Sequence, residues 1–465
     1  MAVSGCCVIF LSLILVRLYW GCFILGVFMF TRSLVAVAIA TASVSAAALP
    51  GAAGKGPNVT YGYSGHGVNL HSLSNNPAQG FYVMPEEDRF RMGVAGSISV
   101  GFEMGEVDNF LDRLDDILDD LERDDIGVAE GITLANEMND VLVQMGRDGY
   151  ARINTGLQAP LTPIAFRTSL GTFSVSIEAD AEVKASVLDD AVVYDAVNQE
   201  LRTRSSLYLK SATFAQVGVG WAKELWKDEG QSLVGGARLN IINGAFSKQV
   251  INLKAAATNP DDDDIGDIIS DQYDTNEKKS TNISIDLGAI YRINNWSAGL
   301  TLKNINEPEF DYGAVGQNCA SLPGGSQEYA NCMAADYFAQ NGRISASEKW
   351  VMASQATVDG SYSFNNGRGM VGFSYDLTDV NTPTGDLQQM LSLMTAYQSP
   401  KIWLPGVRAG YHTNQKGSQL SSVSVGLTWF NRLTFDVLMG LEDTEIDGDK
   451  LPRTAAVSLG WQSRF

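Results

Sequence analysis

The chain has 465 residues, a formal net charge of −20 and a pI near 4.5, and 45% of its residues are hydrophobic. This length fits either several small domains or one large barrel. A nucleic-acid-binding surface needs clustered Lys and Arg to displace counterions, and the sequence contains no run of that kind. The composition therefore argues against a nucleic-acid partner and leaves the fold open.

Residues 1–48 have the layout of a secretory signal peptide. A short basic segment begins at Met29, an apolar Ala/Val-rich run follows over residues 33–45, and small residues suit cleavage near Ala46 or Ala48. This layout predicts export and a true start at Met29. The alternative is an N-terminal anchor helix, because the apolar stretch that precedes Met29 is long enough to span a bilayer.

The cysteines divide into two groups. Cys6, Cys7 and Cys22 lie in the leader, so the predicted cleavage leaves Cys319 and Cys332, in a loop rich in Gly, Ser and Asn. In an oxidising compartment two such cysteines are expected to form a structural disulfide. Loop entropy would make it stabilising by about 3 kcal/mol. A metal pair is the weaker hypothesis, because the sequence places neither a histidine nor a third cysteine nearby.

The dominant signal from residue 91 onward is the alternation of apolar and polar side chains with a period of two. Such alternation places the apolar side chains on one face of a strand and the polar ones on the other. Strands of about ten residues with this pattern are what a lipid-crossing strand requires, and a sheet in lipid has to close on itself. A clear example has its apolar residues at Val423, Val425, Leu427 and Trp429.

The pattern predicts an all-β fold, an antiparallel outer-membrane-type β-barrel of about 12–14 strands over residues 91–465. Residues 49–90 are expected to form an N-terminal extension, and a helical insertion is expected at about 106–149. The alternative is a soluble periplasmic β-protein, in which the same alternation would pack a dry core. Such a core normally includes strands that are apolar on both faces, and the sequence has few of them.

Two further patterns favour a membrane barrel. Aromatic residues near the ends of the predicted strands, such as Trp221, Trp403 and Trp429, suit the interfaces of a bilayer. The last predicted strand is amphipathic and the sequence stops at Phe465, a position typical of the signal recognised by outer-membrane assembly machinery. We therefore expect outer-membrane lipid and the barrel assembly machinery as partners, in the outer membrane of a Gram-negative bacterium.

The predicted connections present a conflict. In outer-membrane barrels long and short connections alternate between the two sides of the membrane. Counted back from a last strand that ends on the inner side, the long connections land on the periplasmic side. Either one strand is missing or surplus in this count, or the barrel is unusual. The short connections are 292–295, 365–369 and 430–432, and the long ones are 243–281, 304–349 and 378–402.

Helical spacing replaces alternation in a few places. From Val107 to Leu121 apolar residues recur at every third or fourth position between acidic residues, and the stretch from Glu130 to Met145 continues in the same style. This acidic pair is expected to plug the lumen, to cover the rim or to project into the periplasm. A short loop helix is also predicted from Asp386 to Tyr397.

No residues form a recognisable catalytic arrangement. Only His66, His71 and His412 could act as histidine general bases, and the sequence lacks both the G-x-S-x-G and the H-E-x-x-H motifs. We therefore expect neither an enzyme nor a bound cofactor or metal.

Two acidic groups have a plain interpretation beside a functional one. Asp261–Asp264 could hold a divalent cation, but the spacing is not that of an EF-hand, and a solvated loop is the preferred interpretation. Glu178, Asp180 and Glu182 follow one face of a predicted strand and could favour cationic solutes in a lumen. We interpret them as ordinary polar filling of a barrel interior.

Two motifs resemble a known family. The Asn-Pro-Ala sequence resembles a segment of the fatty-acid-transporter-like (FadL-like) outer-membrane barrels. The phrase over residues 299–310, together with residues 404–411, resembles the barrel-type TraF conjugal-transfer family, and the likeness covers about residues 57–465. The residues that carry the motifs are Asn76, Pro77, Ala78, Lys303, Asn304, Asn306, Glu307 and Pro308.

The resemblance implies a barrel related to transporters of hydrophobic substrates, with a name linked to plasmid conjugation. It carries over no binding residues. The first functional hypothesis is therefore an outer-membrane channel for small or hydrophobic solutes. The alternatives are a structural or assembly component of a conjugation or secretion apparatus, and a soluble periplasmic β-protein.

Overall fold

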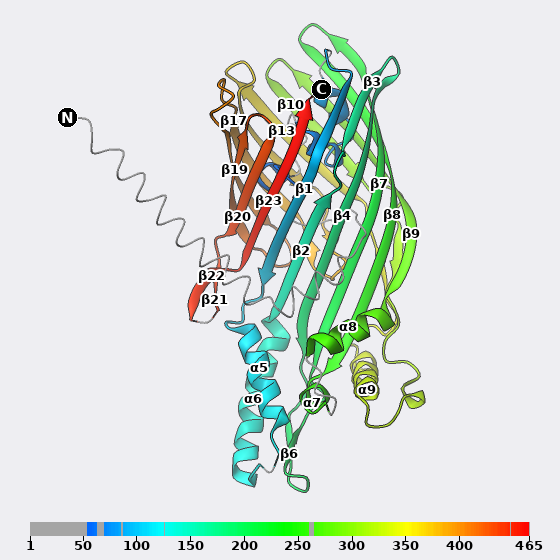
Figure 1. Cartoon of the computed structure of the whole chain (residues 1–465), viewed down its shortest axis with the longest axis vertical. Helices are drawn as coiled ribbons and strands as arrows, with labels where there is room; N and C mark the ends of the chain where they lie inside the picture. The colour runs from blue at the N-terminus through cyan, green and yellow to red at the C-terminus, as the bar shows by residue number, and fades with distance from the viewer. Residues whose placement is uncertain are drawn as a thin grey trace, which may run out of the picture.

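The barrel wall is one antiparallel sheet that closes on itself (Figure 1). The computed structural model describes residues 54–62, 69–84, 87–124, 126–259, 265–446 and 448–464. The strands of the wall are β1 (Phe90–Met104), β2 (Tyr150–Gln158), β3 (Ile164–Thr168), β4 (Gly171–Leu188), β7 (Ser206–Asp228), β8 (Gln231–Asn252), β9 (Lys278–Ile293), β10 (Trp296–Lys303), β13 (Gln355–Phe364), β14 (Gly369–Asp376), β17 (Met390–Tyr397), β18 (Gly406–Asn414), β19 (Ser421–Trp429), β20 (Leu433–Gly440) and β23 (Thr454–Arg464).

The order of the strands explains the closure. β2 and β3 lie one after the other between β1 and β4, and β1 pairs with β23, so the sheet closes as a 14-strand barrel. Every pair in the wall is antiparallel, as between β19 and β20 or β7 and β8. This confirms the predicted outer-membrane-type barrel of about 12–14 strands.

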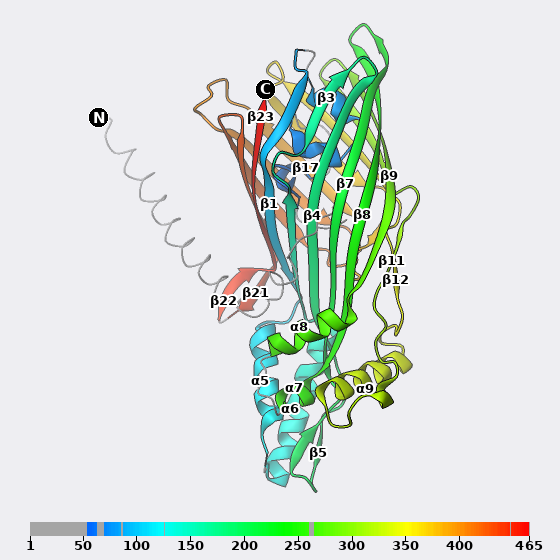
Figure 2. The same cartoon turned by 45° about the vertical axis from the view of Figure 1, so that its right-hand side comes forward.

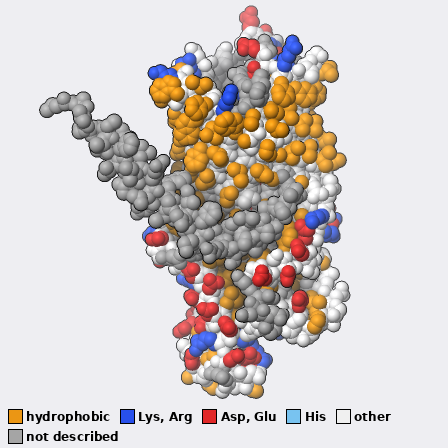
Figure 3. Space-filling view, in the orientation of Figure 1, with side chains coloured by type: hydrophobic (Ala, Val, Ile, Leu, Met, Phe, Trp, Pro, Cys, Tyr) orange, Lys and Arg blue, Asp and Glu red, His pale blue; other side chains and the backbone are white. Residues whose placement is uncertain are grey.

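The two faces of the wall differ in the way that the alternation predicts. On β19, Val423 and Val425 are exposed on the outside, whereas Ser424 between them is 2% exposed and faces the lumen. Figure 3 shows hydrophobic side chains in a band over the visible face of the barrel, with charged side chains gathered above and below it. A closed sheet satisfies its own backbone hydrogen bonds, so a band of this kind can contact lipid.

The long connections all leave the barrel at the end opposite the one where β23 ends (Figures 1 and 2). We call this end the loop end. Short turns join the strands at the other end, as between β9 and β10 or β19 and β20. The barrel therefore has the usual alternation of long and short connections, and the conflict in the sequence-based count disappears.

The conflict arose from one wrong prediction. The segment from Asp386 to Tyr397 is not a helix: it contains the short β16 (Leu387–Gln388) and the wall strand β17, which pairs with β14 and β18. Met394 on the luminal face and Leu393 on the outer face are both apolar, so the period of two is obscured and the spacing looks helical. Hydrogen bonding to β14 and β18 makes this segment a strand. With one more strand in the count, every connection before β17 moves to the opposite side of the membrane from the side that the sequence-based count gave it.

A group of helices and one hairpin projects beyond the loop end, and we call it the cap (Figure 2). Its buried side chains include Phe110, Leu121, Leu142 and Met145, which pack with the far ends of β4 and β7. The predicted acidic helical pair therefore projects from the barrel instead of filling it. No described helix has the length and hydrophobicity needed to span a bilayer. The cap elements are α5 (Phe110–Glu122), α6 (Val128–Asp148), β5 (Val193–Asp195), β6 (Glu200–Arg202), α7 (Leu253–Ala257), α8 (Ile265–Asn276), η2 (Cys319–Ser321) and α9 (Gln327–Gln340).

The predicted disulfide is confirmed. Cys319 in η2 and Cys332 in α9 are bonded, with their Cα atoms 5.5 Å apart. The bond ties η2, which follows β11 (Glu309–Asp311) in the long connection after β10, to the helix α9 that packs against β8. It therefore stabilises one part of the cap.

Replacing both cysteines by serine is expected to loosen α9 alone. The bond closes a loop with a sequence separation of 13, so its loss should lower the local stability of the cap by about 3 kcal/mol. Hydrogen exchange measured by mass spectrometry should become faster in peptides from α9. Peptides from β19 serve as the internal control, and equal exchange of α9 in both proteins would contradict the prediction.

Residues 54–62 and 69–84 lie inside the barrel, and we call them the plug (Figure 1). The plug contains α3 (Asn58–Tyr61), η1 (Leu70–Ser74) and α4 (Gln79–Val83). α3 contacts β17, β18, β19 and β20, and α4 contacts β4, β7 and β8 on the other side of the lumen. The described part of the predicted N-terminal extension thus crosses the interior of the barrel.

Besides the hairpin of β5 and β6 in the cap, the described long connections contain three further small hairpins. The first packs over Phe214 and Phe246 of the wall through Phe310 and Trp350, which narrows the loop end of the lumen. The hairpins are β11 (Glu309–Asp311) with β12 (Lys349–Val351), β15 (Val380–Asn381) with β16, and β21 (Asp443–Ile446) with β22 (Asp449–Pro452).

Candidate functional site

An acidic stripe on β4 anchors the plug. Glu178, Asp180 and Glu182 face the lumen and are 1–2% exposed. Lys55 of the plug donates hydrogen bonds to Glu178 at 3.1 Å and to Asp180 at 2.7 Å, and Arg238 of β8 donates to Glu178 at 2.9 Å. A buried carboxylate needs such partners, because desolvation of an uncompensated charge is costly. The stripe interpreted above as polar filling therefore also holds Lys55 in place.

The opposite wall holds the plug through a second ion pair. Arg408 of β18 donates to Asp436 of β20 at 2.8 Å, and both side chains are at most 5% exposed. The hydroxyl of Thr60 in the plug donates to the same carboxylate at 2.6 Å. The backbone N–H of Gly56 donates to the Ser458 hydroxyl of β23 at 2.8 Å. Polar contacts thus join the plug to both sides of the wall.

The Asn-Pro-Ala motif wedges the plug against β8 and β9. The Asn76 amide donates to the Leu300 carbonyl at 3.3 Å, and Asn76 Oδ1 accepts from the Ala78 N–H at 2.9 Å. A Cβ at Gly236 would lie 2.4 Å from the Ala78 nitrogen, and a Cβ at Gly288 would lie 2.0 Å from Asn76 Oδ1. These two wall glycines leave the space that the motif occupies.

The second motif forms the turn that follows β10. Asn304, with φ of +53°, accepts a hydrogen bond from the Ser284 hydroxyl at 2.7 Å, and the Asn306 amide donates to the Ile283 carbonyl at 2.6 Å. Asparagine tolerates the left-handed backbone conformation, because its short polar side chain bonds locally. The two asparagines therefore fasten the turn to β9.

The remaining residues of the second motif continue this turn and reach the lumen. Glu307 accepts a hydrogen bond from the Ser354 hydroxyl at 2.7 Å, and the Pro308 carbonyl accepts from the Met352 N–H at 2.9 Å. Lys303, the last residue of β10, lines the luminal cavity described below. The structure thus brings Lys303 close to the plug and gives the other motif residues contacts within the turn.

A charged network closes the loop end of the lumen. Asp386, in the connection after β14, accepts from Lys184 at 2.5 Å and from Arg152 at 3.3 Å, and Arg152 also donates to Glu103 at 2.5 Å. Burial raises the pKa of Asp386, but the positive charges of Lys184 and Arg152 lower it more, so the pKa lies below its ordinary value. Asp386 therefore stays ionised and holds its loop against β2 and β4.

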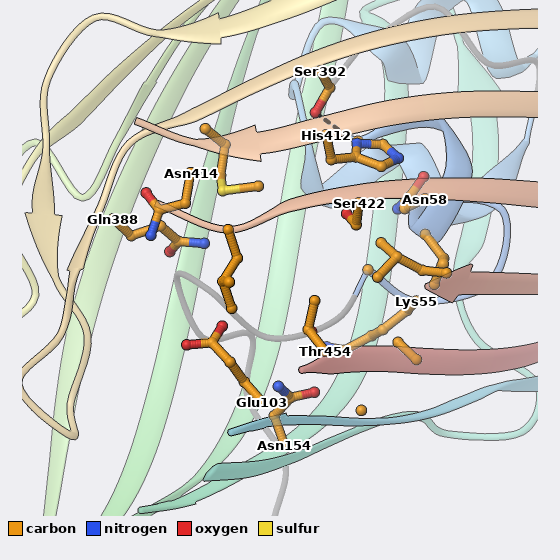
Figure 4. Close-up of a pocket in the computed structure, with 18 of the residues that line it drawn as sticks. Lys55, Asn58, Glu103, Asn154, Gln388, Ser392, His412, Asn414, Ser422 and Thr454 are labelled. Atoms are coloured by element: carbon orange, nitrogen blue, oxygen red, sulfur yellow. Dashed lines mark hydrogen bonds between the residues drawn. The ribbon is translucent and has the colours of Figure 1, made fainter. Parts of the chain in front are cut away.

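A cavity of about 200 Å³ lies between the plug and this loop-end network (Figure 4). Plug, wall strands and the connection after β14 all contribute to its lining. Figure 4 shows the side chains of the wall and of the plug converging on this space. Its polar lining includes Lys55, Asn58, Glu103, Asn154, Gln388 and His412.

The described histidines bond to neutral side chains. His412 lies between the hydroxyls of Ser392 and Ser424, with nitrogen–oxygen distances of 2.9 Å on both sides. His71 of the plug bonds to the amide of Gln158. Among the residues with a described position, no group of three or more His, Cys, Asp or Glu side chains is placed to hold a metal ion. His71 and His412 are therefore buried polar groups with neutral hydrogen-bond partners.

Some predicted features lie outside the described residues: the signal peptide over 1–48, His66, the acidic run Asp261–Asp264 and the C-terminal Phe465. Their proposed roles stay predictions.

Comparisons with known proteins place the chain in a family. The family model described as F plasmid transfer operon, TraF, protein matches residues 74–376. No curated protein matches the chain.

Solved structures of similar shape include the following three. They are a FadL homologue from Pseudomonas aeruginosa (11% identity, 90% of this chain and 99% of that chain covered, TM-score 0.40), the Ralstonia pickettii toluene transporter TbuX (12%, 85% and 94%, 0.40) and the Pseudomonas putida toluene transporter TodX (10%, 90% and 97%, 0.36). Similarity at this level carries no argument about function. The family model, in contrast, covers well over half of the chain, and the chain therefore belongs to the F plasmid transfer operon TraF protein family.

Proposed function

We propose that the chain is an outer-membrane channel that passes small solutes when the plug moves within the lumen. The observation that carries this proposal is the polar contact between plug and wall. Lys55, Thr60 and Gly56 meet the wall through ion pairs and hydrogen bonds, and a cavity lies directly beside them. Because the interior of an outer-membrane barrel is usually polar, it is the cavity beside these contacts that gives the plug room to move.

Polar contacts of this kind suit a movable plug. Apolar packing also seats the plug: Leu70, Leu73, Val83 and Met84 form a buried cluster with Ala165 of β3, and Ala78 packs with Val234 and Ile290. Displacing this part would expose hydrophobic surface to water, and that cost adds to the cost of breaking the polar contacts. At the polar contacts, water can replace the partners of Lys55 and Thr60, so each contact contributes only about 0.5–1.5 kcal/mol, or somewhat more where a charge takes part. The lumen can therefore open without unfolding the wall.

The test is flux through liposomes that contain the purified mature protein. Small neutral and charged solutes should enter these vesicles faster than they enter vesicles without protein, and planar bilayers should show discrete conductance steps. Vesicles with inserted protein that stay as tight as protein-free ones would end the proposal.

The outer membrane is the proposed location, and the lipid-facing band supports it. In this proposal residues 1–48 direct export and Phe465 is recognised during barrel assembly. Cell fractionation checks the location: the protein should need detergent for its release. Release by carbonate or high salt alone would support the soluble alternative.

A second candidate function is a role in assembling a conjugation apparatus. Membership of the TraF family and the projecting cap, with its own buried core, favour it. Deleting α5 and α6 should then impair mating while solute flux through the barrel persists. Normal mating by such a mutant would count against this role. We propose no enzymatic activity.

A further inference from the structure

One long connection crosses the lumen at the loop end. It joins β14 to β17 and contains β15 and β16, and we call its residues 380–388 the strap. The strap leaves the wall between β14 and β17, but its turn contacts β2 and β4. Seven strands separate these two places in each direction, so the strap reaches the opposite side of the 14-strand barrel. The two sets of seven are β17, β18, β19, β20, β23, β1 and β2, and β14, β13, β10, β9, β8, β7 and β4.

Polar contacts fasten the turn of the strap to this opposite wall, and we call them the latch. Asp386 accepts hydrogen bonds from Lys184 of β4 at 2.5 Å and from Arg152 of β2 at 3.3 Å. The Thr384 hydroxyl donates to the carboxylate of Glu182 on β4. The side chain of Asp386 is 21% exposed, so water can reach the latch and replace its partners.

The base of the same connection is anchored on its own side of the barrel. Asp376 at the end of β14 accepts from the backbone N–H of Met390 at the start of β17 at 3.0 Å. The Leu387 carbonyl accepts from the Asn414 amide of β18 at 3.1 Å. Release of the latch therefore frees the turn while the base stays on the wall.

The strap is seated by hydrogen bonds and not by apolar packing. The Tyr312 hydroxyl donates to the Pro383 carbonyl at 2.6 Å, and Trp350 Nε1 donates to the Asn381 carbonyl at 3.0 Å. The hairpin of β11 and β12 packs on the wall through an aromatic cluster, whereas the strap adds no side chain to the apolar clusters of the described residues. Lifting the turn therefore exposes little hydrophobic surface, in contrast to lifting that hairpin.

The strap covers the cavity on the side of the loop end. Leu387 and Gln388 of the strap belong to the lining, and so do Glu103 and Arg152 beside the latch. Figure 4 shows Gln388 and Lys55 of the plug on opposite sides of this space. The plug thus borders the cavity on one side and the strap on the other.

We infer that the strap is a gate in series with the plug: its turn leaves β2 and β4, and the cavity then opens to the loop end. This inference rests on the proposed channel function and adds a second barrier that a solute has to pass. The latch around Asp386 sets how often this gate is open.

The first experiment measures how fast a reagent reaches the cavity. Ser422, which lines the cavity from β19, is replaced in the full mature chain by Ser422→Cys, and its reaction with a small uncharged methanethiosulfonate reagent is timed in proteoliposomes. Cys319 and Cys332 do not compete, because they are bonded to each other. Adding Asp386→Asn removes the negative charge of the latch. The reaction should become about ten- to hundredfold faster, which corresponds to the loss of one hydrogen bond to a charged group.

Asp379→Asn is the matched control for this substitution. Asp379 lies in the same connection, is exposed and takes no part in the latch. The same exchange of carboxylate for amide at this position should leave the reaction rate of the Ser422→Cys thiol unchanged.

The second experiment holds the strap closed. Thr384→Cys and Glu182→Cys replace the hydroxyl and the carboxylate that bond in the latch, and a short bifunctional thiol reagent joins the two cysteines. Solute flux should then fall to the level of protein-free liposomes. A monofunctional reagent of the same chemistry, applied to the same variant, is the control and should leave flux in place.

The outcomes separate the gate from the channel proposal. Flux that persists after the strap is joined to β4, or equal reaction rates with Asp386→Asn and Asp379→Asn, would overturn the gate and leave the channel. A faster reaction with Asp386→Asn in vesicles that never show flux would support a movable strap and end the channel proposal. A thiol that fails to react in every variant would overturn the inference.

Discussion

Joining the plug to the wall through the substitutions Gly80→Cys and Ala222→Cys is expected to reduce solute flux to the level of protein-free liposomes. A Cβ built at Gly80 of α4 lies 3.3 Å from the Cβ of Ala222 on β7. This separation is close to the roughly 3.5–4.5 Å that disulfides require, so a shift of a few tenths of an ångström allows the bond. The bond would prevent the displacement of the plug on which the proposed channel depends.

Reduction provides the comparison within one protein. Flux should recover when the engineered bond is reduced in the same vesicles. The native disulfide between Cys319 and Cys332 is reduced as well, so the unmodified protein under the same reductant is the matched control. The single substitution Gly80→Cys reports the effect of the side chain alone. Equal flux in the oxidised and reduced states would show that solutes pass without movement of the plug.

The wall of the barrel could be predicted from the sequence because its two faces meet different solvents. On β19 the exposed Val423 and Val425 alternate with the buried Ser424, and each position is decided by local chemistry. The same rule failed at β17, where Leu393 faces outward and Met394 faces the lumen. A luminal side chain that packs against other parts of the chain need not be polar, so alternation alone could not identify this strand.

The plug could not be predicted, because nothing near it in the sequence specifies its place. Lys55 lies between two glycines without helical or strand periodicity, and its partner Glu178 is 123 residues away. The pairing of Thr60 with Asp436 spans 376 residues. Only the closure of the sheet brings these groups together. A buried stripe of three carboxylates does, however, require cations from elsewhere in the fold, and that requirement could have directed attention to Lys55.

The family-like motifs also did not show which of their residues belong to the candidate site. Asn76 and Lys303 both belong to the motifs that resemble a known family, but they have different roles in the structure. Asn76 packs into the space that Gly236 and Gly288 leave, so its role is steric. Lys303 lines the cavity, so it contributes a charged group there. Sequence spacing could not separate these two roles, since both depend on neighbours far along the chain.

Replacing Val425 by arginine is expected to destabilise the folded barrel in lipid by about 2–4 kcal/mol, the cost of placing Arg on the lipid face near the middle of the bilayer. Val425 lies at the centre of β19 with its side chain 57% exposed, and it faces Val437 and Ala409 on the neighbouring strands. The measurement is urea unfolding of the protein inserted in phospholipid vesicles, followed by tryptophan fluorescence. The midpoint should move to lower urea concentration.

The matched control is the same substitution, valine to arginine, at a position exposed to water. Val197 in the cap is 89% exposed and carries the same side chain, so Val197→Arg should change the unfolding free energy by no more than about 0.5 kcal/mol. Both valines are exposed, but an arginine is stabilised by water at Val197 and destabilised by lipid at Val425. If Val425→Arg were tolerated as well as Val197→Arg, the exposed side of β19 would have to face water, and the chain would be a soluble β-protein.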